Sequence, residues 1–226
     1  MATQFANGKI VTDGLVLSLN AADKNSYPGS GTTWIDTSGN GNHVTLTNGP
    51  TWNSFGYFTN DVDSYFTGNG SSSIPTGNNS YTMVVWARQN GNWGGAYGLI
   101  SIGGYGTTNQ SNALRTLGSG VGTFHHYWWA NDLSISSNTA NIGTNDWFMA
   151  AASFDGTTRR VWLNGISQSS DTPVGHNVTS TTIQISKTVS TEYQLGDMAA
   201  AYIYNRALST VEMLQNYNAQ KSRFGL

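Results

Sequence analysis

Short apolar segments recur along this chain of 226 residues at intervals of about ten residues, and turn-forming residues separate them. Only one segment, close to the C-terminus, carries the three-residue spacing of an amphipathic helix. Many short segments with regular turn signals are typical of antiparallel sandwiches and barrels. We predict strands over Leu15–Leu19, Thr32–Ile35, Val44–Leu46, Trp52–Phe58, Ser64–Phe66, Tyr81–Arg88, Leu99–Ile102, Phe124–Ala130, Trp147–Phe154, Arg159–Leu163, Ile183–Ser186 and Ala199–Tyr204.

Two dipeptides predict tight turns between the strands of one meander. Asp155-Gly156 joins two predicted strands, and Asn164-Gly165 follows the second. Asparagine and glycine tolerate the positive φ angles that short hairpin turns require. Residues 147–170 therefore read as three consecutive antiparallel strands.

The predicted helix runs from about Thr210 to Ala219. Ser209 with Glu212 three residues later forms a capping box. An apolar stripe of Val211, Leu214 and Tyr217 follows at helical spacing. We therefore expect an all-β fold, a jelly-roll sandwich of two antiparallel sheets with one short C-terminal helix. Its expected organisation is an N-terminal arm at 1–12, a sandwich domain at 13–220 and a tail at 221–226.

Composition excludes several classes of protein. Gly, Ser, Thr and Asn make up close to half the chain and only 10 % of residues are charged, which excludes coiled coils and helix bundles. Eight Trp, eleven Tyr and eight Phe supply the apolar mass that a disordered chain lacks. The net charge of −2 with scattered basic residues argues against nucleic acid as a partner.

The chain also lacks cysteine, so disulfides, thiolate metal sites and cysteine nucleophiles are excluded. No apolar run reaches half the length of a membrane span. The first residues lack the apolar core of a secretory signal peptide. We therefore expect synthesis in a host cytoplasm without an export leader.

Three segments together resemble the concanavalin A-like lectin/glucanase superfamily, in its laminin G-like branch. Residues 13–50 contain an opening strand and the loop W-x-D-x-S-G-N-G-N. Residues 81–88, YTMVVWAR, resemble the central strand of the branch. The hairpin FDGTTRRVWLNG at 154–165 and the closing segment at 202–226, which begins YIYNRALS, complete the match. The resemblance covers nearly the whole chain and implies a concanavalin A-like sandwich.

Further segments resemble laminin G-like domains of tailed-phage virion proteins, namely residues 26–34, the HHYWW of 125–129 and the RFGL of 223–226. This similarity implies a place on a virion surface. One departure concerns a G-x-I-D-E pattern that many relatives carry before the last strand. Here the stretch reads Gly196-Asp197-Met198-Ala199-Ala200, so the acid is lost or has moved to Asp197.

Glycoside hydrolysis is the enzymatic alternative for this superfamily, and it requires two facing carboxyl groups. The chain has two glutamates, Glu192 and Glu212, and the capping box already uses the second. Asp61 and Asp63 have the alternate spacing of strand neighbours but lie among turn residues. We therefore assign no catalytic residue.

A loop with alternating oxygen side chains, Asp36, Ser38 and Asn40, resembles the first half of a calcium loop. The closing glutamate of an EF-hand would fall at Thr47, so that motif is incomplete. Calcium is thus a possible cofactor. The alternative is an Asx-turn network that holds the loop with its own hydrogen bonds.

The aromatic strand 124–130 is the candidate sugar site. Alternation places His125, Tyr127 and Trp129 on one face, and Asn131 and Asp132 follow directly. The neighbours His125 and His126 then point to opposite faces and cannot chelate one ion. The alternative is that both faces are structural, one in the core and one at a subunit interface.

Three functional hypotheses follow. The first is a non-enzymatic structural protein on a phage virion surface, such as a capsid decoration, fibre or tail subunit. It would pack against other virion proteins or form a homo-oligomer. The second is an adhesion module that recognises host-surface glycan, and the third is a glycoside hydrolase.

Overall fold

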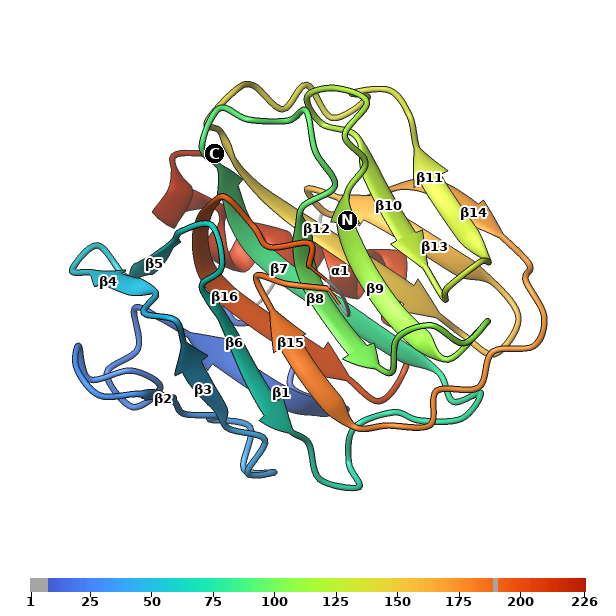
Figure 1. Ribbon diagram of the computed structural model, residues 1–226, viewed down its shortest axis with the longest axis horizontal. Coiled ribbons are helices and arrows are strands. Elements are labelled where there is room, and N and C mark those ends of the chain that lie inside the picture. Colours follow the sequence, from blue (N-terminus) through green and yellow to red (C-terminus); the bar gives the residue numbers. More distant parts are fainter. Residues whose placement is uncertain (1–7, 189–190) are drawn as a thin grey trace, which may run out of the picture.

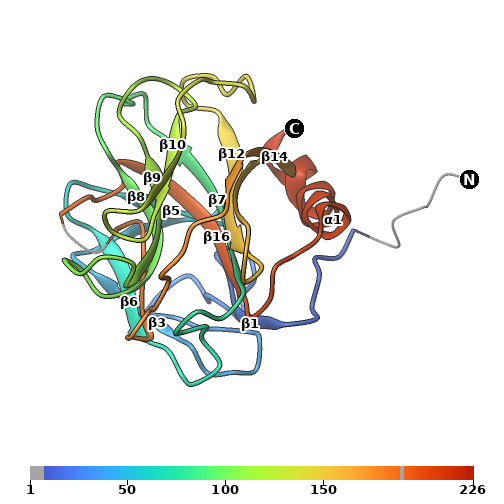
Figure 2. The ribbon, with the colours of Figure 1, turned by 90° about the vertical axis from the view of Figure 1, so that its right-hand side faces the viewer.

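The computed structural model describes residues 8–188 and 191–226, and these form two antiparallel sheets stacked face to face (Figures 1 and 2). Sheet A contains, in spatial order, β14 (Ile166–Asp171), β13 (Arg159–Leu163), β12 (Trp147–Phe154), β7 (Tyr81–Gln89), β16 (Gly196–Tyr204), β5 (Tyr57–Asn60) and β4 (Thr51–Asn53), while β1 (Leu15–Asn20) also pairs with β16. Sheet B contains β11 (Asp132–Ile135), β10 (Phe124–Tyr127), β9 (Ser111–Thr116), β8 (Gly98–Gly103), β15 (Thr182–Ile185), β6 (Tyr65–Asn69), β3 (Val44–Thr47) and β2 (Thr33–Trp34). The predicted two-sheet sandwich is confirmed.

The central strands β7 and β12 are buried on both sides, and this explains why their sequences are almost continuously apolar. In β7, Met83 and Val85 face the core between the sheets, whereas Val84 and Trp86 belong to a second apolar cluster on the outer side of sheet A. The helix α1 (Thr210–Gln220) covers that outer side (Figure 2). Sheet A is therefore sandwiched between sheet B and the helix.

The capping box predicted for α1 is confirmed. The amide of Glu212 donates to Ser209 Oγ, and the amide of Ser209 donates to the Glu212 carboxylate at 2.8 Å. Arg206 binds the same carboxylate through both terminal nitrogens. These contacts, led by the Arg206 hydrogen bond, lower the pKa of Glu212 to about 2.

The segment predicted as a C-terminal tail is structured. Residues Lys221–Phe224 form a 3-10 helix, η1. The Phe224 ring stacks on Trp86 with 4.3 Å between ring centroids and also contacts Trp147. An apolar face on sheet A thus holds the end of the chain in place.

The predicted N-terminal arm ends in an ordered contact. Residues 1–7 of that arm lie outside the described residues. The Val11 amide donates to Asn216 on α1 at 2.8 Å, and its carbonyl accepts from Tyr204 at 3.0 Å. The end of the predicted arm therefore contacts both α1 and β16.

The strand predictions differ from the structure in four main respects. β9 and β11 were not predicted, and the predicted strand Trp52–Phe58 is two strands, β4 and β5, separated by a turn. The predicted strand Phe124–Ala130 ends at Tyr127, because Trp129 and Ala130 adopt positive φ angles of 68° and 50°. The third strand of the predicted meander is confirmed as β14, after the Asn164-Gly165 turn. Across the described part of the chain, no helix is long and apolar enough to span a membrane.

Candidate functional site

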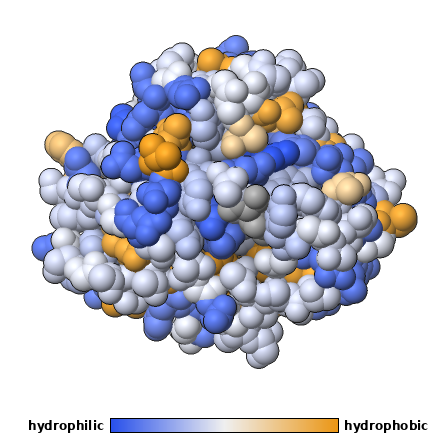
Figure 3. Space-filling model, in the orientation of Figure 1, coloured by the Kyte–Doolittle hydropathy of each residue, from blue (hydrophilic) through white to orange (hydrophobic). Residues whose placement is uncertain are grey.

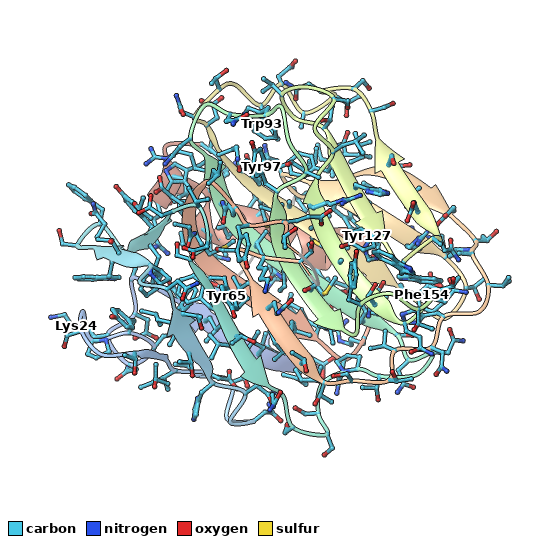
Figure 4. The ribbon with its side chains drawn as sticks, in the orientation of Figure 1. Lys24, Tyr65, Trp93, Tyr97, Tyr127 and Phe154 are labelled. Atoms are coloured by element: carbon cyan, nitrogen blue, oxygen red, sulfur yellow. The ribbon has the colours of Figure 1, made fainter. Side chains whose placement is uncertain are left out.

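A cavity of about 300 Å³ lies on the outer face of sheet B, on the side turned toward the viewer in Figures 1 and 3. Its lining comprises Arg115, His125, Tyr127, Trp129, Ala130 and Asp132, and we call it the Tyr127 cavity. Figure 4 shows Tyr127 on this near face, as well as Tyr65 of β6. Apolar side chains on the face form separate patches among polar ones (Figure 3).

Strand register assembles the floor of the Tyr127 cavity. β10 lies between β9 and β11, with His125 opposite Arg115 and Tyr127 opposite Asp132. Residues paired in this way lie side by side on one face of a sheet. The side chains of His125 and Tyr127 therefore lie on the outer side of sheet B, where they are 6 % and 3 % exposed, and two charged residues flank them.

A turn after β10 supplies the aromatic wall. The Trp128 amide donates to the Asn131 carbonyl at 3.0 Å, and Trp129 sits inside this turn in the left-handed region. That backbone is strained for a bulky residue, and such strain is found at functional sites. The Trp129 ring contacts Tyr105 edge-on with centroids 4.2 Å apart, and lies 6.4 Å from the Tyr127 ring.

The guanidinium of Arg115 is held by three contacts. Its Nε donates to His125 Nδ1 at 3.0 Å, and its Nη1 donates to Glu192. Its Cζ lies 4.7 Å from the centroid of the Tyr127 ring. Glu192 also accepts from the Tyr127 hydroxyl at 3.3 Å and from Thr188. Arg115 is therefore charge-paired and oriented by its neighbours.

His125 is neutral near neutral pH. Burial lowers its pKa to about 4, the Arg115 charge adds to this effect, and Asp132 opposes it. Because Nδ1 accepts a hydrogen bond from Arg115 Nε, the proton of the neutral ring lies on Nε2. That nitrogen lies 3.6 Å from Asp132 Oδ2. The ring thus presents a donor toward the cavity rim.

Asn131, predicted as a sugar contact, is not among the residues that line the cavity. Its Oδ1 accepts from Arg159 Nη2 at 3.2 Å, and its Nδ2 donates to Asn109 at 2.8 Å. Arg159 is wholly buried, and its guanidinium lies 4.5 Å from the centroid of the Trp128 ring. Four of the five predicted residues, His125, Tyr127, Trp129 and Asp132, line the cavity, while Asn131 supports the turn.

Sequence reasoning missed Arg115 and Glu192. Arg115 lies on β9, whose sequence SNALRT has no alternating apolar pattern to mark a strand. Glu192 lies in a Ser/Thr-rich stretch far along the chain. The sequence signal that could have drawn attention to them is their charge, because only 10 % of the residues in this chain are charged.

The inner side of β10 is structural. His126 Nε2 lies 2.7 Å from the Tyr81 hydroxyl, which also accepts from Trp128 Nε1 at 2.9 Å. Both side chains are wholly buried. The prediction that His125 and His126 point to opposite faces is confirmed.

The proposed calcium residues form a hydrogen-bond network. The Asp36 carboxylate accepts from the amides of Ser18, Ser38 and Asn42 at 2.8 to 2.9 Å and from the Ser38 hydroxyl at 2.8 Å. The Asn40 side chain donates to Ser38 Oγ. Within residues 8–188 and 191–226, no three His, Asp or Glu side chains cluster as a metal site would require. These are the contacts that the Asx-turn alternative predicts, and the calcium alternative is left to experiment.

Asp197, the acidic residue that lies in the stretch compared with the G-x-I-D-E pattern, also has a structural role. It is buried and pairs with Arg88, whose Nε donates to its Oδ2 at 2.8 Å. Thr59 donates to its other oxygen at 2.8 Å. The Arg88 guanidinium in turn lies over the Trp147 ring. Asp197 thus joins β16 to its neighbours in sheet A.

No family model matches this chain, and no curated protein matches it by sequence. Solved structures match its fold. The receptor-binding domain of botulinum neurotoxin D aligns with a TM-score of 0.70 and 17 % identity, over 92 % of this chain and 53 % of that one. The botulinum neurotoxin serotype D ligand-binding domain in complex with N-acetylneuraminic acid aligns at 0.69 with 16 % identity, over 93 % and 52 %. Trypanosoma rangeli sialidase aligns at 0.70 with 15 % identity, over 93 % and 33 %.

These comparisons confirm a lectin-like β-sandwich as the fold. At such identities the likeness concerns the fold alone. The chain spans about half the length of the toxin domains and a third of the sialidase.

Proposed function

We propose that this chain is a non-catalytic carbohydrate-binding module whose ligand occupies the Tyr127 cavity. The observation that carries the proposal is the composition of that cavity, in which Tyr127 and Trp129 adjoin a carboxylate and an imidazole N–H. Sugars present both apolar C–H faces and hydroxyl groups. A site with aromatic walls and a few placed polar groups suits both.

The volume and the rigidity of the site support this reading. About 300 Å³ is at the lower end of small-molecule sites, which favours a short stretch of sugar rather than a large ligand. Arg115, Glu192 and the Tyr127 hydroxyl form one connected network. A preorganised wall loses little entropy when a ligand binds.

The solved structures with a similar fold add support. They include receptor-binding domains and one domain whose structure contains N-acetylneuraminic acid. A sialidase is also among them. We favour binding over hydrolysis, because among the described residues only one carboxylate, that of Asp132, lines the cavity. Glu192 is engaged by Arg115, Thr188 and the Tyr127 hydroxyl.

Glycan-array binding of the wild type and two variants tests the proposal. Trp129→Ala removes the aromatic wall and is expected to weaken binding at least about tenfold, as loss of an aromatic anchor does. Phe55→Ala is the matched control, because Phe55 is 81 % exposed in the turn between β4 and β5 on sheet A. It should bind as the wild type does. Absence of binding to every glycan, or equal binding by Trp129→Ala, would refute the proposal.

We also propose that the module is carried on the surface of a phage particle, next to other virion proteins. The support is the sequence resemblance at 26–34, 125–129 and 223–226. Repeated copies on a particle would be related by symmetry, so a homo-oligomer is expected. Immunogold labelling of purified particles and light scattering of the isolated protein test this. Unlabelled particles and a monomer at high concentration would count against it.

A further inference from the structure

We propose that the Tyr127 cavity selects sugars that carry a free, protonated amine and discriminates against acidic sugars. This inference rests on the proposed function, since it specifies the ligand of the same site. It comes from one juxtaposition, that of a charge-paired Arg115 and a solvent-facing Asp132.

Arg115 is poorly placed to bind an acidic sugar. A carboxylate is best held by two parallel N–H groups of one guanidinium. Here Nε already donates to His125 and Nη1 to Glu192, and the Tyr127 ring covers one face of the plane. The Arg115 side chain is only 21 % exposed. An acidic sugar would have to displace Glu192 before it could pair with Arg115.

The cavity lining together with Glu192, which lies beside it and pairs with Arg115, carries a net negative charge. Arg115 and Glu192 cancel, and His125 is neutral because burial holds its pKa at about 4. Asp132 has a side chain that is 47 % exposed, and among the described residues the basic side chain within 4 Å of its carboxylate is the neutral His125 ring. The cavity thus carries one uncompensated carboxylate at its rim.

That carboxylate can distinguish ligands that differ only in charge. An ammonium group within reach of Asp132 gains an ion pair, whereas a carboxylate at the same position is repelled. Partly exposed pairs of this kind are screened and contribute modestly. We expect the amine-bearing form of a sugar to bind about fivefold more tightly than its N-acetyl form in low salt.

The test uses printed sets of gluco- and galacto-configured oligosaccharides in three forms, with free amines, with N-acetyl groups and with a terminal sialic acid. Binding is measured at mildly acidic pH, where the amines are protonated. The expected order is free amine, then N-acetyl, then sialylated. Asp132→Asn should make the first two forms bind equally. Asp13→Asn, which removes an exposed carboxylate on the helix side of sheet A, should keep the wild-type order.

A second variant tests the role of Arg115. Glu192→Gln removes the charge that neutralises Arg115 while keeping an oxygen that can accept from Tyr127 and Thr188. Binding of the sialylated form should rise about fivefold or more relative to the other two. Unchanged relative binding in this variant would contradict the assigned charge balance.

The outcomes separate this inference from the proposal beneath it. If no form of any sugar binds, the proposed function itself fails. If sugars bind but the sialylated form is the tightest, or the amine and N-acetyl forms bind equally to the wild type, only the charge preference is overturned. Equal loss of order in Asp132→Asn and Asp13→Asn would mean that overall charge, and not the cavity, sets the preference.

Discussion

Arg159, wholly buried between the sheets, donates from Nη1 to the carbonyl oxygen of Asn131 at 2.8 Å. The first residue lies on β13 of sheet A and the second in the turn between β10 and β11 of sheet B. This contact ties the two layers together at the turn that presents Trp129. The core of the sandwich and the shape of the Tyr127 cavity are therefore linked through one side chain.

Replacement of Arg159 by Gln is expected to lower the free energy of unfolding by about 2–4 kcal/mol, because it leaves Asp171 and the Asn131 carbonyl without their partner. The adjacent Arg160→Gln is the matched control. Arg160 is partly exposed and pairs with Asp155 at the surface, so its loss should cost less than about 1 kcal/mol. Urea unfolding followed by fluorescence measures both.

The same pair of variants addresses the cavity. Under conditions where both remain folded, Arg159→Gln should weaken glycan binding, because the turn that carries Trp129 loses its support. Arg160→Gln should bind normally. Wild-type affinity in folded Arg159→Gln would show that the turn does not depend on Arg159.

Acid should destabilise the fold through three histidines that are held neutral. Burial is the main cause in each, lowering the pKa to about 4 in His125 and His176 and well below its usual range in His126. The unfolded chain, with a histidine pKa of 6.5, binds more protons than the native protein below that pH. The contribution of these histidines to the free energy of unfolding is thus fully present above pH 6.5. It decreases toward pH 4, by up to about 1.4 kcal/mol per pH unit for each histidine.

Urea titrations at a series of pH values between 7.5 and 5 test this slope. His176→Gln keeps a polar group near Asn112. It should reduce the slope of the unfolding free energy against pH by the contribution of one of the three histidines. A free energy of unfolding that is constant over the range would rule out neutral buried histidines.

The C-terminal contact should stabilise the fold independently of the ligand site. Phe224→Ala removes a ring stacked on Trp86 and is expected to cost about 1–3 kcal/mol. Leu226→Ala, at a more exposed position two residues later, should cost little. Both variants should keep wild-type glycan affinity, because η1 lies on sheet A and the Tyr127 cavity on sheet B. Thermal denaturation and array binding together check this.

The Asp36 loop should be stable without metal. Its carboxylate satisfies three backbone amides, so Asp36→Asn, which places an NH₂ group against N–H donors, should cost about 1–3 kcal/mol. The melting temperature of the wild type should be the same in EDTA and in millimolar calcium. A rise of several degrees with calcium would instead support the calcium loop.

Local chemistry made much of the fold predictable. The Asn164-Gly165 turn and the Ser209–Glu212 capping box act through neighbouring residues, and both were found from sequence. β9 was missed because its residues form a strand only through pairing with β8 and β10 on either side. Phe224 was read as part of a tail because its partner Trp86 lies far along the chain.

In the candidate site, too, the features set by neighbouring residues were predictable and the contacts between distant residues were not. Alternation along β10 correctly placed His125 and Tyr127 together. Trp129 was predicted to share their face as part of the strand, but it joins them through a turn with positive φ. Arg115 and Glu192 meet across 77 residues of sequence, and nothing local to either marks that contact.

The central claim is that sugar binds at the Tyr127 cavity, and the indole N–H signals of the tryptophans report on it directly. A ¹⁵N-labelled sample titrated with the tightest glycan from the array should show its largest indole shift at Trp129, assigned by its loss in Trp129→Ala. Signals of Trp86 and Trp162, which lie in the apolar cluster on the helix side of sheet A, should stay in place. Shifts confined to Trp86 or Trp162, with Trp129 unmoved at saturation, would contradict the account.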